Sequence, residues 1–427
     1  MKKILKQLVV AVLGMQVRRL RKKNDFKIIG VVGGIGKTST KMAIAHTLSG
    51  LDIRVRWQEG NYNDIVSVPM VFFGHEMPSL LNPLAWLKIF LLNSIQVLKP
   101  YPYDYVIVEL GTDGPGQITK FKKYLQLDYG IVTSIVSEHM EQFGDMQSIA
   151  EEELSVTSFS KQIIYNADFV AADHRPLLQE TSISYGMHSN EASYRISNVF
   201  QSAGGIDADI KYQNDILLHI TQEIVSEVQF YSVLAAVVIC HQLGIKSVDL
   251  KQALQSIRPV SGRLRRLRGI NNSTIIDDTY NASPEAVKAG LAALYKLQSP
   301  QKIAILGNMN ELGAMSAQAH KEIGELCDPS QLKLVVTIGP DANAHLAPAA
   351  EAKGCLVRSF DNPYDAGEYV EGKVEPQAII FAKGSQNKVF AEEAVKQLLA
   401  DPEDASKLVR QSPNWLSKKS KAFPKNF

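Results

Sequence analysis

The sequence predicts an α/β protein, and three observations support this fold class. Short runs rich in β-branched residues alternate with helical patterns along all 427 residues, which is typical of helices packed on parallel sheets. Many of these runs stop at glycine or polar residues, as strands do where an open α/β sheet presents ligand loops. In addition, 45% of the residues are hydrophobic, so a chain of this length can bury more than one core. We therefore expect a central domain with a parallel sheet and a second, C-terminal α/β domain.

The chain begins with a basic and apolar segment. Residues 3–23 predict an amphipathic helix, with five apolar residues broadly on one face. These are Leu5, Leu8, Val9, Val12 and Leu20. The uncharged stretch 8–15 is far shorter than the roughly 20 residues that span a bilayer. We expect the apolar face to pack on the protein itself; a basic helix lying on an anionic membrane is the less favoured alternative.

The remaining elements follow in order along the chain. Four buried strands are predicted at 27–33, 104–111, 128–135 and 161–168, and a buried helix at 228–245 that ends at Gly244. The stretch 257–269 combines proline, glycine and basic residues, which predicts a domain joint. A second series of strands follows, in "STIIDDTYNASP", "KIAILGNM", "LKLVVTIGP" and "QAIIFAKGS".

These elements divide the chain into four parts. We expect an N-terminal helix over 1–25, a central domain over 26–259, a C-terminal Rossmann-like domain over 260–400 and a basic tail over 401–427. The tail is polar, and we expect it to fray.

Composition bounds the function. The 46 basic and 44 acidic residues leave a formal net charge of +2, which gives no overall attraction to nucleic acid. The three cysteines, Cys240, Cys327 and Cys355, lie far apart and show no metal-ligand spacing. We expect thiols in a reducing, cytoplasmic setting.

A glycine-rich turn between the strand at 27–33 and a helical pattern predicts a nucleotide site. Its backbone N–H groups can approach phosphate oxygens, Lys37 can neutralise phosphate charge, and the Thr38 hydroxyl can bind Mg²⁺. The strict pattern G-x-x-x-x-G-K-[ST] is not met, because Val31 stands where its first glycine belongs. A glycine-rich turn without a ligand is the less favoured reading. The expected ATP-binding residues here are Gly33, Gly34, Ile35, Gly36, Lys37, Thr38 and Ser39.

Two further residues follow predicted strands and suggest Mg²⁺ ligands. Glu109 ends the apolar run "YVIVEL", where a carboxylate is costly unless it is paired or metal-bound. His139 follows the next strand, in "SEHMEQFGD". Considered alone, Glu109 would be interpreted as part of a salt bridge at a strand end, and His139 as a structural histidine. Together with Thr38, they are expected to meet at one sheet edge.

With these motifs, the chain resembles the Mur ligase family, the ATP-dependent amide-forming enzymes of peptidoglycan assembly. The matching motifs occur in order: "GGIGKTST", "GNYNDIVSVP", "VELGTDGPGQI", "SEHMEQFGDMQSIAEEE", "YNAD", "SGRLRRL", "IIDDTYNASPEAVKAGL", "AILGNMNELG" and "FAKGS". The combination of "DDTYNASP", "LGNMNELG" and "KGS" is similar to the branch that adds D-Ala-D-Ala to a muramoyl tripeptide.

The resemblance implies roles for individual residues. Lys37 and Thr38 hold the ATP phosphates and Mg²⁺, with Glu109 and His139 as metal ligands. Asn166 lies near the nucleotide, Arg263 reaches the phosphates, and Asp278 binds the ribose. The residues implied to bind the two substrates are Asn61 and Asn63 in the loop of "GNYNDIVSVPMVFFGHE", Tyr280, Asn281, Lys383 and Ser385.

The chain departs from the family pattern in three places. Where relatives carry a carbamylated lysine it has "EEEL", with Glu153 as the matching carboxylate and catalytic residue; the alternative is a solvated helix face over 151–153. The adenine-side pattern reads "SEVQFYS". The usual N-terminal domain that grips a UDP-sugar has no counterpart here.

The resemblance implies a cytoplasmic, monomeric ligase that uses ATP and Mg²⁺ and acts through an acyl phosphate. Its partners would be a muramoyl-peptide-type carboxylate and a D-Ala-D-Ala-type amine. Two alternatives stay open. One is an enzyme similar to folylpolyglutamate synthetase or another amino-acid ligase, and the other is a non-catalytic, ATP-binding Mur-like subunit.

Overall fold

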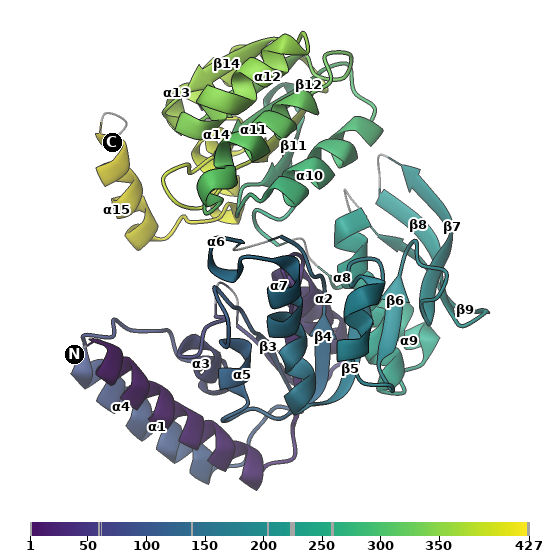
Figure 1. The fold of residues 1–427 in the computed structure, drawn as a ribbon, viewed down its shortest axis with the longest axis vertical. Helices are drawn as coiled ribbons and strands as arrows, with labels where there is room; N and C mark the ends of the chain where they lie inside the picture. Colours follow the sequence, from purple (N-terminus) through teal and green to yellow (C-terminus); the bar gives the residue numbers. More distant parts are fainter. Residues whose placement is uncertain are drawn as a thin grey trace. The chain divides into compact units, whose positions relative to one another are not determined.

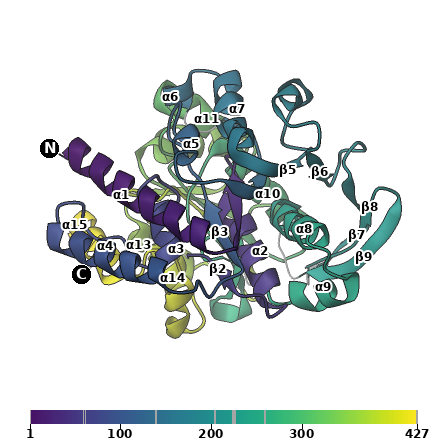
Figure 2. The same ribbon diagram turned by 90° about the horizontal axis from the view of Figure 1, so that it is seen from below.

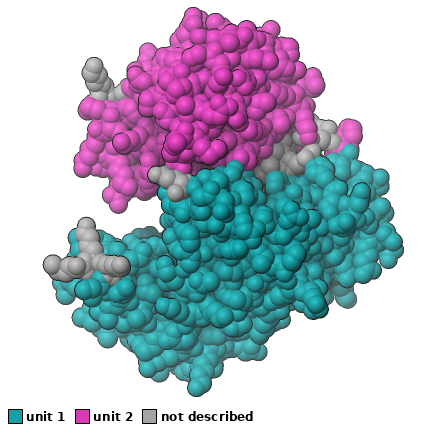
Figure 3. All heavy atoms as spheres, in the orientation of Figure 1, with its two compact units in different colours: residues 1–199, 207–221, 230–258 teal, residues 200–206, 222–229, 259–427 magenta. Residues whose placement is uncertain are grey.

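The structure, a computed structural model, describes residues 2–58, 60, 62–137, 140–202, 205–222, 227–257 and 260–424. The chain forms two compact units, coloured separately in Figure 3. Unit 1 contains Met1–Val199, Asp207–Thr221 and Phe230–Arg258, and unit 2 contains Phe200–Ile206, Gln222–Gln229 and Pro259–Phe427.

Unit 1 is built on a nine-stranded sheet with the order β2-β3-β1-β4-β5-β6-β7-β8-β9. Every pair from β2 to β7 is parallel. All four strands predicted for this part of the chain are present, as β1, β3, β4 and β5. The last three strands follow one another through short connections, an extension that the sequence analysis did not predict. The bounds are β1 Lys27–Val32, β2 Val55–Arg56, β3 Tyr105–Glu109, β4 Leu127–Val132, β5 Ser160–Asn166, β6 Ile183–Gly186, β7 Tyr194–Ser202, β8 Gly205–Tyr212 and β9 Asp215–Gln222.

Helices of unit 1 cover this sheet (Figure 1). The predicted buried helix is α8, and Gly244 after it has a φ of 78°, the left-handed conformation with which helices often end. The helices are α2 Lys37–Ser49, α3 Ser67–Phe73, α4 Pro83–Leu98, α5 Ile118–Phe121, α6 Met140–Phe143, α7 Met146–Leu154, α8 Glu227–Gln242 and α9 Ser247–Leu254.

The N-terminal helix α1, Lys2–Lys23, packs on α3 and α4. Its buried residues recur at helical spacing, at Val9, Leu13, Val17 and Leu20, so the expected packing on the protein itself is confirmed. The expected face was wrong in part, because Leu8 is 59% exposed. Leu5 and Val12 are only half-buried, and Leu13 and Val17 take their place in the buried stripe. Within the described residues, no helix has the length and apolar content that crossing a membrane requires.

Unit 2 has a six-stranded sheet with the order β10-β11-β15-β12-β13-β14, parallel except for β10. Neighbouring residues on its strands enter different cores: Ile275 and Ile305 pack with α13 and α14, whereas Ile276 and Leu306 pack with α10, α11 and α12. Since side chains alternate along a strand, helices cover both faces, as in a Rossmann-like domain. The bounds are β10 Arg265–Arg268, β11 Thr274–Asp278, β12 Lys302–Gly307, β13 Leu334–Ile338, β14 Val357–Phe360, β15 Ile379–Lys383, α10 Pro284–Lys296, α11 Ser316–Glu325, α12 Ala347–Ala352, α13 Pro363–Glu371 and α14 Glu392–Gln397.

The described part of the C-terminal segment, residues 401–424, is helical and packs on unit 2, so a frayed tail is not what the structure shows there. It contains a 3₁₀ helix, Pro402–Lys407, and the helix α15, Pro413–Ala422. Lys419 of α15 is fully buried, with its Nζ 2.9 Å from Glu392 and 2.5 Å from Glu393. Arg410 pairs with the other oxygen of Glu392 at 2.6 Å. Paired buried charges hold the segment to unit 2, because separating them would leave charges unpaired in the interior.

Candidate active site

The turn between β1 and α2 has a backbone that only glycine adopts readily at two positions. Gly33 has a φ of 120° and Gly36 a φ of 89°, both in the region that disfavours other residues. A Cβ atom on Gly33 would also meet the backbone N of Ser134 at 2.7 Å. The turn is therefore close-packed against the segment that follows β4.

The end of β4 fixes the shape of this turn. The hydroxyl of Ser134 accepts a hydrogen bond from the Ile35 N–H at 2.7 Å, and its carbonyl accepts one from Gly34 at 3.1 Å. Thr133 donates to the Ile35 carbonyl at 2.7 Å. The sequence analysis placed this strand correctly but missed Thr133 and Ser134, which carry no motif of their own.

Lys37 is the first residue of α2, and its ammonium donates to the carbonyls of Gly33 and, at 3.0 Å, Gly34. The N–H groups of the first helical turn, including those of Thr38 and Ser39, have no partner within the helix. A helix N-terminus with an adjacent lysine is suited to an anion. The turn thus has the chemistry of a phosphate site.

Thr38 and Glu109 meet at the carboxyl ends of β1 and β3, as the sequence predicted. The Thr38 hydroxyl donates to Glu109 Oε2 at 3.0 Å. The same oxygen lies 3.3 Å from Nζ of Lys41, and both side chains of this pair are almost fully buried. Lys41 lies one helical turn after Lys37 and was missed, because a lysine in a helical sequence usually lies on the surface.

Gly60 and Asn63 lie near the same strand end. The Asn63 carbonyl accepts a hydrogen bond from the Gly111 N–H at 2.8 Å, and Lys41 donates to the Gly60 carbonyl at 3.4 Å. Asn63 therefore contacts the chain at Gly111, two residues after Glu109. Asn61 and His139 fall outside the described residues.

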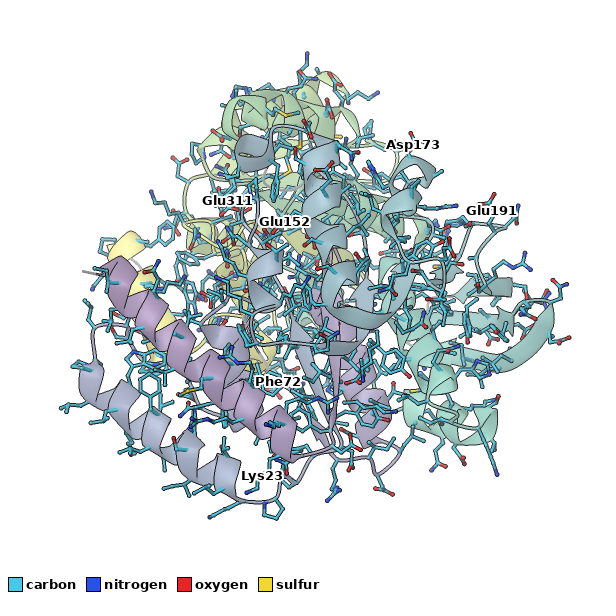
Figure 4. The ribbon with its side chains drawn as sticks, turned by 60° about the horizontal axis from the view of Figure 1, so that its bottom comes forward. Lys23, Phe72, Glu152, Asp173, Glu191 and Glu311 are labelled. Carbon is cyan, nitrogen blue, oxygen red and sulfur yellow. The ribbon has the colours of Figure 1, made fainter. Side chains whose placement is uncertain are left out.

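Three consecutive glutamates of α7 have three different environments. Glu153 is buried and its Oε2 accepts a hydrogen bond from the Gly33 N–H at 2.8 Å. Glu152, labelled in Figure 4, accepts from the N–H groups of Gly116, Gln117 and Ile118 at 2.6 to 2.7 Å. Only Glu151 is exposed, so the alternative of a solvated helix face over 151–153 was wrong. Glu153 places a carboxylate at the glycine-rich turn.

Asn166 ends β5, and its side chain accepts a hydrogen bond from the Asp168 N–H at 3.1 Å. Burial alone would raise the pKa of Asp168, but hydrogen bonds from His188, Met187, Tyr231 and Ser189 outweigh it and lower that pKa. Tyr231 belongs to the segment "SEVQFYS" and donates to Asp168 at 2.8 Å. This segment therefore supports the loop after β5, a role that the sequence did not reveal.

In unit 2, the predicted residues gather at the ends of β11 and β15. The ammonium of Lys383 lies 2.6 Å from Asp278 Oδ2 and donates to the Asn281 carbonyl at 3.0 Å. Burial raises the pKa of Asp278, although the charges of Lys383 and Arg263 oppose this rise. The sequence analysis named Asp278 and Lys383 separately and did not predict that they pair.

Arg263 lies over the ring of Tyr280, with 4.1 Å from its Cζ to the ring centroid. Its buried Nε has no hydrogen-bond partner among the described residues. A guanidinium held by an aromatic face, with an unused donor, is suited to an anionic group. Ser385 is buried, donates to the Ala282 carbonyl at 3.2 Å and accepts from the Asn310 N–H at 2.9 Å.

Two buried residues that the sequence analysis did not single out support this cluster. Asp277 accepts hydrogen bonds from Gly262 and Thr279, and burial raises the pKa of Asp277 to about 6. His320 accepts from the Met309 N–H at 2.9 Å and faces the Ser316 carbonyl at 2.8 Å, so its Nδ1 carries the proton. They orient the loops of "DDTYNASP" and "LGNMNELG".

The residues of unit 1 fit ATP and Mg²⁺. The glycine turn, Lys37 and the start of α2 match a phosphate group, and the oxygens of Thr38 and Glu109 are hard donors of the kind that Mg²⁺ prefers. Within the described residues, no group of three histidine, cysteine, aspartate or glutamate side chains is arranged to hold a metal by itself.

Comparisons with known proteins agree with this geometry. Residues 31–240 match the family described as Mur ligase middle domain, and residues 262–386 match the Mur ligase, glutamate ligase domain. The UDP-N-acetylmuramoyl-tripeptide–D-alanyl-D-alanine ligase of Bacillus subtilis (strain 168) is 26% identical over 383 residues, which cover 88% of this chain and 76% of the relative.

Two solved structures share the fold. The MurF ligase of Thermotoga maritima in complex with ADP has a TM-score of 0.74 and 22% identity, over 93% of this chain and 84% of that chain. The folylpolyglutamate synthase of Mycobacterium tuberculosis, complexed with ADP and AMPPCP, has a TM-score of 0.66 and 16% identity, over 94% of this chain and 97% of that chain.

Proposed function

The chain belongs to the Mur ligase family, and from this premise we propose that it is an ATP-dependent, ADP-forming ligase that joins D-Ala-D-Ala to a muramoyl tripeptide on the cytoplasmic side of the cell. The observation that carries the proposal is the convergence of Lys37, Thr38 and Glu109 at the ends of β1 and β3. These residues would supply a cation for the transferred phosphoryl group and oxygen ligands for Mg²⁺.

The reaction has two steps. An oxygen of the substrate carboxylate attacks the γ-phosphate of ATP, forming an acyl phosphate and releasing ADP. The amine of the dipeptide then attacks the acyl carbonyl, the phosphate leaves, and the amide forms with loss of a proton from the amine. Lys37 would offset negative charge on the transferred phosphoryl group. Mg²⁺, held by Thr38 and Glu109 with His139 as a further ligand, would supply electrostatic stabilisation of the same oxygens.

Unit 2 would supply the remaining contacts. Arg263 would approach the phosphates and Asp278 the ribose, with Tyr280, Asn281 and Ser385 near the dipeptide. Lys383 would attract the dipeptide's terminal carboxylate, although its pairing with Asp278 at 2.6 Å reduces the charge that it can offer.

A pocket of about 800 Å³ beside α1 offers a place for the carboxylate substrate. It lies between α1 and the segment 111–124, which continues from Glu109. Phe121 and Tyr124 contribute apolar and ring surface. Four cations and two carboxylates are also on its wall: Lys6, Arg18, Lys120, Lys123, Asp64 and Asp113. The excess of positive charge suits the anionic groups of a UDP-muramoyl peptide.

Product identification tests the proposed function. Enzyme, Mg-ATP and UDP-muramoyl tripeptide are incubated with D-Ala-D-Ala or with single amino acids, and the products are weighed by mass spectrometry. We expect a mass gain of one dipeptide. Addition of glutamate to a folate would instead support the folylpolyglutamate-type enzyme, for which the similar extent of the Mycobacterium tuberculosis structure is the favouring observation. Tight ATP binding without any product would support the non-catalytic subunit.

Steady-state kinetics test the pocket. The double change Lys120→Ala and Lys123→Ala should raise KM for the muramoyl substrate roughly ten-fold and leave KM for ATP unchanged, because each exposed cation contributes about 0.5–1 kcal/mol to binding an anion. Lys122→Ala is the matched control, since Lys122 is exposed and does not line the pocket. Equal effects of Lys122→Ala and the double change would contradict the pocket.

A further inference from the structure

The helix α4 presents a continuous apolar face to solvent. Its exposed residues are spaced by three or four along the helix, so they share one side. Leu84 is 78% exposed and Leu98 74% exposed, although both are leucines that would be buried in a core. The exposed apolar residues of this face are Leu84, Leu87, Leu91, Ile95 and Leu98, and Leu81, Leu92 and, on α1, Ile4 and Leu8 are exposed as well.

This exposure is not a consequence of loose packing of α4. Its other side is fixed to α1, where Trp86 and Ile89 pack with Val9 and Leu13. The side chain of Gln16 donates to the Phe90 carbonyl at 2.8 Å.

The two helices run parallel and side by side in both ribbon views (Figures 1 and 2). At their far ends, Lys23, labelled in Figure 4, donates to the Leu98 carbonyl at 2.5 Å. The α1–α4 pair is therefore a firm layer that carries its apolar face outward.

Charge distinguishes this layer from the rest of the chain. Residues 2–23 contain eight basic and no acidic residues, and residues 83–98 contain one basic and no acidic residue. The remainder of the chain has 37 basic and 44 acidic residues. The formal net charge of +2 is thus the sum of +9 on the two helices and −7 on the remainder of the chain.

The apolar face of α4 and the positive charge around it together indicate which partner binds there. A second copy of the chain would bring another strongly positive layer against the first, which like-charge repulsion opposes. With 16 residues, α4 is shorter than the roughly 20 residues that span a bilayer. An apolar face with basic surroundings instead matches a helix that lies in the interface of an anionic bilayer.

We propose that the α1–α4 pair docks the protein on the surface of an anionic lipid bilayer, with the leucines of α4 inserted among the lipids and exposed basic residues of α1, Arg19 and Lys22, at the headgroups. The inference does not depend on the proposed ligase activity. It assigns the membrane contact chiefly to α4, whereas the sequence suggested, at most, a contact by residues 3–23.

Vesicle flotation tests the proposal. The full chain should float with vesicles of phosphatidylglycerol and phosphatidylcholine and remain behind with phosphatidylcholine alone. The triple change Leu84→Ser, Leu87→Ser and Leu91→Ser should lower the partition coefficient about a thousand-fold, because each inserted leucine contributes roughly ten-fold. The matched control changes three other exposed apolar residues to serine: Val248, Leu326 and Leu356.

The charge contribution has its own test. Arg19→Glu with Lys22→Glu, both exposed in α1, should reduce binding more than ten-fold, and added salt should weaken binding by the native chain. Equal binding to neutral and anionic vesicles would overturn the assignment of an anionic surface. The far-UV circular dichroism spectrum and the urea midpoint without vesicles should be unchanged in all these variants, which shows that they fold.

A fluorescent label distinguishes insertion from loose attachment. The three native cysteines are buried, so an environment-sensitive dye can be placed on Leu87→Cys alone. Its emission should shift to the blue with anionic vesicles, whereas the dye on Leu356→Cys should not respond. No shift at Leu87→Cys would overturn the proposal. So would a dimer, seen by sedimentation velocity without lipid, that the triple serine variant dissociates.

Discussion

Two substitutions of Glu153 can distinguish a role in metal binding from a role in shaping the glycine turn. Its carboxylate is buried and accepts the Gly33 N–H at 2.8 Å. Glu153→Ala removes that acceptor and leaves a buried N–H without its partner, which should lower the free energy of unfolding by about 1–3 kcal/mol. Glu153→Gln keeps an oxygen for Gly33 and loses only the charge, so its stability should stay within about 1 kcal/mol of the native protein.

Activity then reports on the charge itself. If Glu153 replaces a carbamylated lysine beside Mg²⁺, Glu153→Gln should raise the Mg²⁺ concentration for half-maximal turnover roughly ten-fold, in the range that supporting groups of metal sites contribute. Turnover by the native enzyme should not respond to bicarbonate, because no lysine has to be carbamylated. Phosphate release at a series of Mg²⁺ concentrations, with urea denaturation of the same samples, measures both effects.

The neighbouring residue supplies the control. Glu151→Gln makes the same chemical change on the exposed side of α7 and should alter neither stability nor Mg²⁺ dependence. A Glu153→Gln variant with native turnover and native Mg²⁺ dependence would refute the metal role and leave Glu153 as a support of the turn. Stimulation of the native enzyme by bicarbonate would refute it as well.

Three more predictions follow from buried or phosphate-binding groups. Lys37→Ala should abolish ATP turnover while changing the free energy of unfolding by no more than about 0.5–1 kcal/mol; equal turnover in both proteins would contradict the phosphate site. Lys41→Met should lower the free energy of unfolding by about 3–5 kcal/mol, because Glu109 would remain buried without its cation at 3.3 Å; urea denaturation measures this, and a native midpoint would contradict it. Since burial raises the pKa of Asp277 to about 6, above its ordinary value, the folded state binds the proton more tightly, and the stability contributed by Asp277 is present below about pH 4 and lost as pH rises through about 6. Urea denaturation between these pH values should therefore show a steeper decline for the native protein than for Asp277→Asn, and parallel curves would contradict the shift.

Local patterns were enough to predict the main architecture. The strands β1, β3, β4 and β5 could be found because buried parallel strands are short apolar runs that stop at polar or glycine residues. The turn at Gly33 and Gly36 could be found because its backbone, with φ values of 120° and 89°, restricts the residue type. Thr38 and Glu109 could be expected to meet because they follow strands of one parallel sheet.

Other features depend on contacts between distant segments, and the sequence could not reveal them. Glu151, Glu152 and Glu153 are the same residue three times, and only the orientation of α7 against the turn and the loop 112–118 decides which is exposed. Lys41 reads as a surface lysine until β3 brings Glu109 to it. Nothing local to residues 83–98 shows which apolar side of α4 is covered, and the structure buries only the side that α1 covers. Sequence therefore determined the four strands around the phosphate turn, the helix α8 and the turn itself, because those depend on local backbone preference and apolar patterning. Tertiary structure decided which charges are paired and which apolar face remains outside, because burial depends on the partner that each side chain meets.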